Sequence, residues 1–429
     1  MTPVTRRAPP LRRSLDLEHT MTDTGTGLAG SANPPAPPRS AGRRQGLLLM
    51  LISCLPVLGS VLLAPVLPRM QDHFEATAGA DALVPITLTV PALMIGVLAP
   101  FAGRFVDRFG RKQLLVGGLV VYALFGTAPL WLEPLPAIVL SRAGVGVAEA
   151  AIMTCCTTLI ADYFSGRERD RWLGLQTVFT ALAATVFFAA GGALGSFGWR
   201  TPFWLYASGL VFAVLAATVL WQPHARTESP AAQAHALPPI PWRTLRAPIL
   251  FTLVGGVVFY TPIVELSYAL DDLGVESTAA IGAISAIASA ATATGAFVFG
   301  RVSGRGTATL LPIAAGLAGT GIVVIGIAGS VAVTAIGAVV ASAGTGLMLP
   351  TLVTWAISSL PFELRGRGTG LWTAAFFIGQ FFCPLIVVGL TAALGGLGGA
   401  LVVVGIASLV MAVAAKTLLP RTPKVRVHV

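Results

Sequence analysis

Long apolar segments, each bounded by polar or charged residues, recur twelve times along the chain. Each segment can cross a bilayer, because a hydrocarbon core of ~30 Å needs about 20 helical residues at ~1.5 Å per residue. Lipid offers the backbone no hydrogen bonds, and the alternation of barrel strands is missing, so we expect helices. The expected spans are residues 46–69, 82–102, 114–132, 135–161, 172–195, 200–221, 247–270, 277–300, 309–329, 332–358, 369–392 and 396–418.

The composition favours a membrane protein over a soluble enzyme. Hydrophobic residues make up 55% of the chain and charged residues 11%, whereas soluble domains have ~45–50% and ~25%. The cysteines, Cys54, Cys155, Cys156 and Cys383, all fall within predicted spans, so neither a disulfide framework nor a zinc-type spacing is expected. The sequence also lacks a phosphate-binding glycine loop before a lysine. We therefore expect no metal, no cofactor and no enzymatic activity.

The positive charges indicate the orientation in the membrane. If both termini are cytoplasmic, 25 of the 28 Lys and Arg residues lie on the cytoplasmic side, as the positive-inside rule requires. The opposite side carries acids instead: Asp72, Glu75, Asp81, Glu133, Asp271, Asp272 and Glu276. The formal charge of +10 is therefore a signal of topology, and the expected partner is the lipid bilayer with its phosphates, not nucleic acid.

The chain divides into five parts. Residues 1–45 are predicted to be a disordered cytoplasmic segment without the apolar core of a signal peptide, and Met21 is an alternative start. A first six-helix bundle covers 46–221, and a cytoplasmic central loop covers 222–246. A second six-helix bundle covers 247–418, and a cytoplasmic tail covers 419–429.

The two bundles are related by a sequence repeat. The segment 103–108, Gly-Arg-Phe-Val-Asp-Arg, matches 300–305, Gly-Arg-Val-Ser-Gly-Arg, at an offset of 197. The segment Arg-x-x-Gly-Leu at 171–175 matches 367–371 at an offset of 196. Duplicated halves of this kind place a substrate cavity between them, near the middle of the bilayer.

The loop after the second span carries the most specific motif. Residues 103–112 read Gly-Arg-Phe-Val-Asp-Arg-Phe-Gly-Arg-Lys, which resembles the G-x-x-x-D-R-x-G-R-K signature of the major facilitator superfamily. The resemblance implies an alternating-access transporter that usually works as a monomer. It also implies a gating loop that contacts the start of the eleventh span and consists of Gly103, Asp107, Arg108, Gly110, Arg111 and Lys112. The second-half counterpart has Gly304 in place of Asp107, so the latch should be asymmetric.

Further motifs match the family in part. The first span contains Leu58-Gly59 followed by Pro65 and Pro68, which is similar to a pattern of twelve-helix efflux proteins. Arg142 in the fourth span is similar to an arginine implicated in proton transfer, although it could simply be a packing residue. An arginine within a span costs at least ~2.5–3.5 kcal/mol and should find a partner. The antiporter motif of the fifth span survives only as Gly191-Gly192, with Phe187-Phe188 where Gly-Pro is expected.

Two carboxylic acids lie within predicted spans, Glu149 and Glu265. A carboxyl group in such a low-dielectric place favours its neutral form and can exchange protons. Glu149 is seven residues from Arg142, on the same helix face, so the two can share a cavity without touching. The alternative is a neutral Glu149 hydrogen-bonded to a neighbouring helix. Glu265 shares a face with Thr261 and Tyr268, and either binds a cationic substrate group or extends to the outer surface.

Five other side chains stand at positions that could face a cavity. They are Gln176, Thr180, Trp355, Trp372 and Gln380.

The leading hypothesis is proton-coupled efflux of a small organic compound across the cell inner membrane. A metabolite symporter or facilitator is the alternative within the transporters. A non-transporting membrane sensor on a permease scaffold is the alternative from another class.

Overall fold

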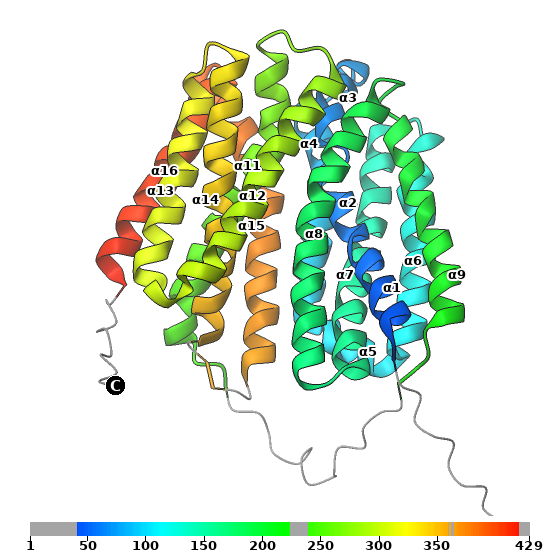
Figure 1. Ribbon diagram of the computed structural model, residues 1–429. Coiled ribbons are helices and arrows are strands. Elements are labelled where there is room, and N and C mark those ends of the chain that lie inside the picture. Colours follow the sequence, from blue (N-terminus) through cyan, green and yellow to red (C-terminus); the bar gives the residue numbers. More distant parts are fainter. Residues whose placement is uncertain (1–40, 224–238, 359, 362–363, 420–429) are drawn as a thin grey trace, which may run out of the picture. The chain divides into compact units, whose positions relative to one another are not determined.

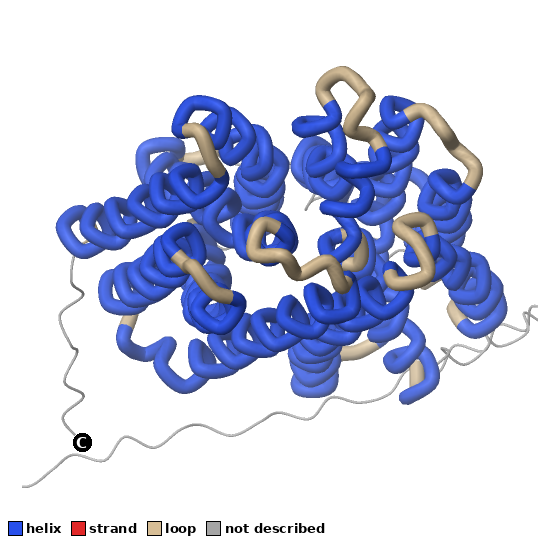
Figure 2. Tube along the Cα trace, turned by 90° about the horizontal axis from the view of Figure 1, so that it is seen from above, coloured by secondary structure: helices blue, strands red, loops and turns tan. Residues whose placement is uncertain are grey.

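The computed structural model describes residues 41–223, 239–358, 360–361 and 364–419, and every regular element in this part is helical. Twelve of its helices or helix series are long and apolar enough to cross a membrane. Figure 2 shows them joined by loops. The prediction of an all-α protein with twelve transmembrane helices is confirmed. The N-terminal segment up to residue 40, the middle of the central loop and the tail from residue 420 lie outside the described residues.

Six spans form the first half, and most contain more than one helical element. In chain order the elements are α1 (Arg43–Ser53), α2 (Leu55–Val61), η1 (Ala64–Val66) and α3 (Leu67–His73), which form one span; α4 (Ala80–Leu98), η2 (Ala99–Phe101) and α5 (Ala102–Phe109); α6 (Arg111–Thr127) and η3 (Ala128–Leu130); α7 (Leu135–Tyr163); α8 (Gly166–Gly195); and η4 (Thr201–Ala207) and α9 (Ser208–Val219).

The second half repeats this plan with longer uninterrupted helices. Its elements are α11 (Trp242–Asp271), α12 (Thr278–Val302) with η5 (Ser303–Arg305), α13 (Thr307–Ile327), α14 (Val331–Ser358), α15 (Arg365–Leu394) and α16 (Leu397–Leu418).

Several helices begin earlier than the apolar pattern predicts. The helix α8 begins at Gly166 instead of residue 172, and α15 begins at Arg365 instead of residue 369. Hydropathy marks only the part of a helix inside hydrocarbon, whereas the helix continues into the polar interface, where Arg and Glu are good helix formers. The first span is broken where Pro56, Pro65 and Pro68 occupy the first turns of successive elements.

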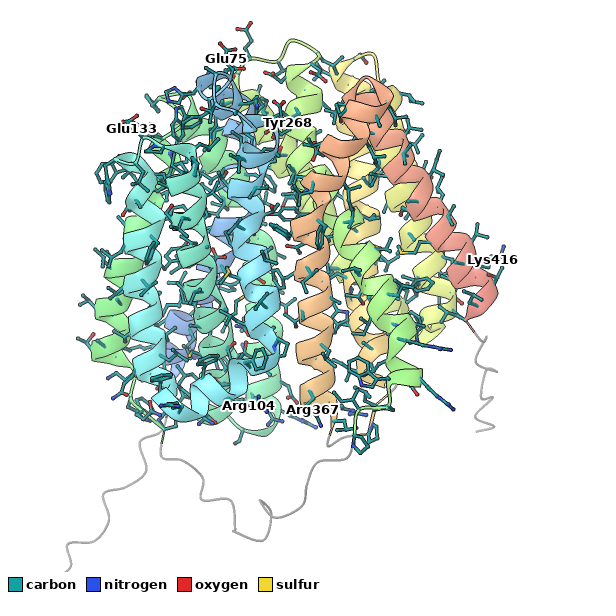
Figure 3. All side chains as sticks on the ribbon, turned by 180° about the vertical axis from the view of Figure 1, so that it is seen from behind. Glu75, Arg104, Glu133, Tyr268, Arg367 and Lys416 are labelled. Carbon is teal, nitrogen blue, oxygen red and sulfur yellow. The ribbon has the colours of Figure 1, made fainter. Side chains whose placement is uncertain are left out.

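The two ends of the bundle differ in charge. Figure 3 shows Arg104 and Arg367 at one end, which we call the basic end, and Glu75 and Glu133 at the other, the acidic end. At the acidic end Arg200 donates to both carboxylate oxygens of Glu133, at 3.3 and 3.2 Å. This pairing holds the pKa of Glu133 below its ordinary value. The separation of charge matches the distribution on which the predicted orientation depends.

Each half has its own apolar core. In Figure 1 the helices α1 to α9 stand on one side and α11 to α16 on the other. The first core consists mainly of residues 48–220, and the second lies between residues 258 and 415. The halves meet chiefly where α8 packs on α12 and where α4 packs on α15.

The backbone preserves the repeat that the sequence predicts. Gly110 and Gly306, each directly before the third helix of its half, have φ of 79° and 77°. Only glycine adopts such left-handed values without cost. The offset of this pair is 196, whereas the matching segments before it are 197 apart, so the turn of the second half is one residue shorter. The pairs Gly79 with Gly274 and Gly198 with Gly395 also share positive φ at corresponding turns.

Hydrogen bonds join the halves in the middle of the bundle and toward the acidic end. Arg69 donates to the carbonyl of Glu276 at 3.4 Å, and Thr278 donates to the carbonyl of Gly192 at 3.0 Å. Two further links are Thr185 to Ser289, at 3.3 Å, and Tyr260 to the carbonyl of Ser60, at 2.7 Å.

Glycines allow the two halves to approach each other closely, because α8 and α12 pack backbone to backbone. A methyl group on Gly192 would overlap the carbonyl oxygen of Thr278, and it would lie 2.8 Å from the Cα of Gly282. The surviving Gly191-Gly192 of the fifth-span motif therefore has a structural cause, since Gly191 faces the carbonyl of Leu62 in the same way.

Replacing Gly192 by valine should separate the halves at this contact. Overpacking costs about 1–3 kcal/mol, so we expect Gly192→Val to lower the melting temperature of the detergent-solubilised protein. Gly174→Val is the matched control, because it lies on the same helix with no atom within 4 Å of its added Cβ. Equal melting temperatures for the two variants would contradict the close contact.

Candidate functional site

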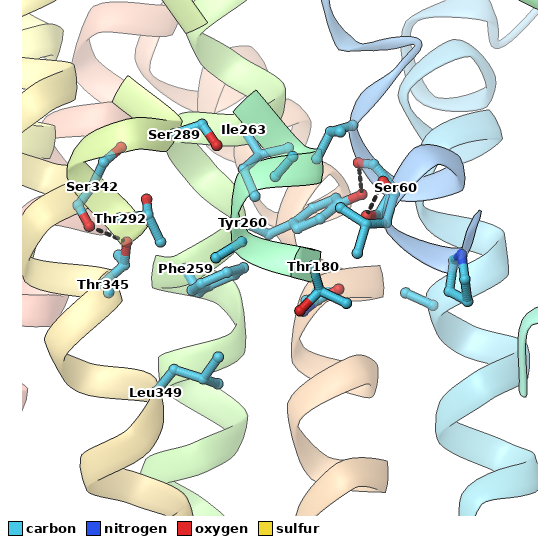
Figure 4. A pocket seen from close by; sticks show the side chains of 18 of the residues that line it. Ser60, Thr180, Phe259, Tyr260, Ile263, Ser289, Thr292, Ser342, Thr345 and Leu349 are labelled. Atoms are coloured by element: carbon cyan, nitrogen blue, oxygen red, sulfur yellow. Dashed lines mark hydrogen bonds between the residues drawn. The ribbon is translucent and has the colours of Figure 1, made fainter. Parts of the chain in front are cut away.

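A cavity of about 310 Å³ lies between the two halves and is lined by residues from both. Side chains from α2, α4, α7 and α8 face others from α11, α12, α14 and α15. Figure 4 shows part of this lining, with Ser60 and Tyr260 on one side and Ser289, Thr292, Ser342 and Thr345 on the other. The volume is within the range of small-molecule sites, ~300–1,000 Å³.

Most of the lining is apolar, with a limited number of polar groups. The polar lining residues are Ser60, Glu149, Thr177, Thr180, Tyr260, Ser285, Ser289, Thr292, Ser342, Thr345 and Gln380. Glu149 is the single residue with a formal charge among them, and no Lys, Arg or His appears in the described lining. The site is therefore suited to a compound with a large apolar part and no negative charge.

Glu149 occupies a position that the first span leaves open. Its side chain is 1% exposed, and its Oε1 lies where the side chain of residue 59 would be. Gly59 has no side chain, so the carboxyl group fits directly against its backbone. Oε1 has no hydrogen-bond partner among the described residues. A buried carboxylate without a partner is costly, so this arrangement favours a group that binds a proton or a cation.

Arg142 is fully buried on the same helix. Its Nε donates to the carbonyl of Thr87 at 3.2 Å, and its Nη2 donates to the carbonyl of Gly59 at 3.2 Å and to the hydroxyl of Tyr206 at 2.7 Å. Its guanidinium also lies over the ring of Tyr206, 4.8 Å from the centroid. Its Nη1 has no partner in the part of the chain that the structure describes.

Arg142 and Glu149 make no ion pair within the described chain, as their spacing predicts, but both contact Gly59. The neighbouring residue Ser60 accepts the hydrogen bond from Tyr260 of the other half. The backbone at Gly59-Ser60 thus connects the buried arginine, the buried acid and the second half of the protein. A change in the charge of Glu149 acts next to a contact between the halves.

The other predicted acid, Glu265, lies elsewhere. It is 5% exposed on α11 and is not part of the cavity lining. Thr261 donates to its own helix, at the carbonyl of Val257, and the hydroxyl of Tyr268 has no partner among the residues described. Neither bonds to Glu265, and the side chain is buried instead of extending to the surface.

The five predicted cavity residues separate into two groups. Thr180 and Gln380 line the cavity. Gln176, Trp355 and Trp372 instead contact neighbouring side chains: Gln176 donates to Ser53 at 2.8 Å, Trp355 packs against Phe251, and Trp372 stacks on Phe376 with ring centroids 5.4 Å apart.

Several residues of the predicted gating loop contact their own half. Arg111 pairs with Asp162 of α7 at 2.6 Å, and the Nζ of Lys112 donates to the carbonyl of Ala217 in α9 at 2.7 Å. Arg108 lies over the ring of Phe109, and the side chain of Gln222 lies against Gly110. Gly103 has open space around it. The side chain of Asp107 lies outside the described residues.

The contact with the eleventh span is made just before this loop. A Cβ on Gly370, near the start of α15, would lie 3.4 Å from the carbonyl oxygen of Ala99 and 3.5 Å from the Cα of Pro100. The turn η2, which leads into the loop, therefore packs directly on α15.

Sequence reasoning missed the hydroxyl residues of the second half. Ser285, Ser289 and Thr292 line the cavity from α12, and Ser342 and Thr345 do so from α14. The spacing of the first three, i, i+4 and i+7, places them on one helix face and could have indicated them. Serine and threonine are common in membrane helices, however, because they can bond to their own backbone.

Comparison with known proteins agrees with this architecture. The sequence model of the Major Facilitator Superfamily matches residues 49–271 and 247–429. Multidrug resistance protein 2 of Bacillus subtilis (strain 168) is 28% identical over 189 residues, covering 42% of this chain and 46% of that protein. The class H tetracycline resistance protein of Pasteurella multocida is 27% identical over 180 residues, covering 41% and 42%. The matched region therefore spans less than half the length of these curated relatives.

Solved structures share the fold across most of the chain. The crystal structure of a D-xylose–proton symporter has a TM-score of 0.75 at 15% identity, covering 88% of this chain and 98% of that one. A bacterial homolog of the human lysosomal transporter Spinster, inward-facing and unoccupied, has a TM-score of 0.72 at 16% identity, covering 88% and 96%.

The contact between Glu149 and Gly59 predicts that substitutions of these two residues have non-additive effects on stability. Gly59→Ala should lower the melting temperature, because the added methyl group overlaps the carboxyl group. In a Glu149→Ala background the same change should cost less, because the overlapping group is gone, and the difference should be about 0.5–3 kcal/mol. Thermal unfolding of the four proteins measures this cycle. Purely additive losses would mean that Gly59 does not provide the space for Glu149.

Proposed function

Since this chain belongs to the Major Facilitator Superfamily and is a membrane transporter, we propose that it exports a small amphipathic organic compound in exchange for protons. The observation that carries this proposal is the buried carboxyl group of Glu149 at the wall of a cavity between the halves, whose Oε1 has no hydrogen-bond partner among the described residues. The similarity to drug-resistance proteins supports efflux as the direction.

In the proposed mechanism, a proton and a cationic substrate compete for Glu149. When neutral, the carboxyl group stays against Gly59 without an uncompensated charge. When ionised, it attracts a positively charged or strongly polar group into an otherwise apolar cavity. The proton and the substrate therefore leave the site on different sides of the membrane as the protein alternates.

Arg142 has a positioning role in this mechanism. It is held by two backbone carbonyls and Tyr206, and it contacts the same Gly59 as the acid. Its fixed positive charge favours the ionised form of Glu149 once the proton has left. It therefore limits the cost of the unprotonated state without forming an ion pair that would block the substrate.

The hydrogen bonds between the halves support a state that is closed at the acidic end. We assign the acidic end to the outer side of the cell inner membrane, because the basic end carries the excess of Lys and Arg. Alternating access then requires Arg69, Thr278 and Tyr260 to release their partners in the other half. The protein would work as a monomer, since both sides of the cavity come from one chain.

A proton-coupled symporter is the second candidate. The observation that favours it is the departure from the antiporter motif, where Phe187-Phe188 replaces Gly-Pro and Phe188 lines the cavity. In a symporter the proton and the substrate would move in the same direction.

Transport in inverted membrane vesicles tests the proposal. An imposed inward-acidic gradient should drive ethidium uptake by the wild-type protein, and Glu149→Gln should reduce the gradient-dependent part at least about tenfold because it cannot exchange a proton. Glu265→Gln is the matched control: it makes the same change at a buried acid outside the cavity lining. We expect it to keep the gradient dependence.

Three outcomes would change the proposal. If flux ignores the pH gradient, the exchange with protons is wrong. If Glu265→Gln alone abolishes the dependence, coupling belongs to Glu265. If the gradient drives ethidium in the opposite direction, the symport alternative holds.

A further inference from the structure

Some hydroxyl groups on the second half of the cavity differ in their hydrogen bonding from those on the first half. Thr345 and Tyr260 are not among them, since they donate to the carbonyls of Ser342 and Ser60. On the first half, Thr180 donates to the carbonyls of Gln176 and Thr177, both at 3.0 Å, and Ser60 donates to the carbonyl of Val57 at 2.9 Å. Bonding to a carbonyl three or four residues earlier is the usual way for a membrane helix to satisfy a hydroxyl. These hydroxyls therefore have no proton left for a ligand.

On the second half four hydroxyls are not bonded in this way. We call Ser285, Ser289, Thr292 and Ser342 the hydroxyl wall. Ser285 is 3% exposed and has no partner among the described residues. Ser289 accepts a hydrogen bond from Thr185 at 3.3 Å, but it donates to no residue that the structure describes. Neither Thr292 nor Ser342 uses its hydroxyl in a hydrogen bond within the described chain, although Ser342 is only 4% exposed.

The hydroxyl wall is held together by close packing of its two helices. A methyl group on Gly346 of α14 would overlap the carbonyl of Thr292 in α12, and one on Gly295 would overlap the carbonyl of Ala343. The two helices therefore approach backbone to backbone at the level of the cavity. In Figure 4 the side chains of Ser289, Thr292 and Ser342 lie together on the side opposite Ser60.

The hydroxyl groups of the hydroxyl wall indicate the chemistry of a molecule that would bind in the cavity. A hydroxyl that is buried without a partner destabilises the protein, so an occupant that offers an acceptor binds more tightly by meeting it. Since the wall holds no ionisable residue, it does not select for a charge. A neutral acceptor such as a carbonyl, ether or hydroxyl oxygen fits hydroxyl donors, which can also accept in return.

We propose that the hydroxyl wall is a second subsite, which binds a neutral oxygen acceptor of the substrate while Glu149 faces its other end. The substrate is then an amphiphile with an apolar body, a cationic end, and at least one carbonyl or similar oxygen at the opposite end. This assignment rests on the proposed function, since it uses the same cavity. It goes further by naming the group that the second half recognises.

Two lipophilic cations of different hydrogen-bonding capacity test the assignment. Rhodamine 6G carries an ester oxygen, whereas tetraphenylphosphonium carries no acceptor. We would measure binding of rhodamine 6G to the detergent-solubilised full chain by fluorescence polarisation and binding of tetraphenylphosphonium by equilibrium dialysis. Thr292→Val and Ser342→Ala should each weaken rhodamine 6G about threefold to tenfold, the scale of one neutral hydrogen bond. Tetraphenylphosphonium should bind both variants as tightly as the wild type.

Matched substitutions separate a lost hydrogen bond from altered packing. Thr294→Val makes the same change on α12 at an exposed site whose hydroxyl donates to Ala290, and it should leave both affinities unchanged. Thr180→Val makes the change within the cavity where the hydroxyl is already bonded, and it should weaken rhodamine 6G less than Thr292→Val does. Unchanged melting temperatures would show that the variants fold.

Equal effects on the two probes, or equal effects of Thr292→Val and Thr180→Val, would overturn the subsite. Failure of the wild-type protein to bind rhodamine 6G would overturn the substrate class. These results differ from a failure of proton coupling, which appears in how the flux through the wild-type and Glu149→Gln proteins depends on the pH gradient. The subsite and the proposed exchange can thus fail separately.

Discussion

The carboxyl group of Glu149 fits between the helices only because residue 59 has no side chain. Much of the site depends on this one contact. The same glycine offers its carbonyl to Arg142, and the next residue accepts the hydrogen bond from Tyr260 of the other half. An acid placed there has backbone on one side and the cavity on the other. A proton or a cationic group can therefore reach the carboxyl group from the cavity.

Contacts between the halves also depend on residues without side chains. The helices α8 and α12 approach through Gly192 and Gly282, without large side chains between their backbones at this point. The linking hydrogen bonds from Arg69 and Thr278 end on backbone carbonyls. Such bonds contribute about 0.5–1.5 kcal/mol for a neutral donor such as Thr278 and about 1.5–3 kcal/mol for a charged donor such as Arg69. In the proposed mechanism, binding of a substrate or a proton supplies a free energy of this size and shifts the balance between two states.

Sequence patterns predicted the architecture well because the bilayer restricts it so strongly. Segments near 20 apolar residues had to be helices, and the repeat around 103–108 and 300–305 has a structural counterpart in the paired turns at Gly110 and Gly306. Glu149 was identifiable because a carboxyl group in an apolar span is costly. The contact of Glu149 with Gly59 could not be predicted in the same way. It depends on how the first and fourth spans are aligned against each other, and this alignment cannot be read from a single sequence.

Residue type alone was a weaker guide to the cavity. Gln176 and Trp372 are polar or aromatic, yet they pack on Ser53 and Phe376, because a helix face is decided by its neighbours. The hydroxyl wall was missed for the opposite reason. Ser285 looks like an ordinary membrane-helix serine until the structure shows that its hydroxyl lines the cavity without a partner among the described residues. The hydrogen-bond partners of each hydroxyl group, which only the structure shows, distinguish a hydroxyl that is available to a ligand from one that bonds to its own helix.

Competition between a proton and a cationic compound for Glu149 can be measured by counting the protons released into weakly buffered detergent solution when a lipophilic cation such as tetraphenylphosphonium binds. We expect the wild-type protein to release a proton on binding and Glu149→Gln to bind without releasing one. Equal proton release by the two proteins would contradict this competition. Binding of the cation to the wild-type protein without proton release at any pH between about 5 and 9 would contradict it too, because a carboxyl group that exchanges protons near neutrality should titrate in this range.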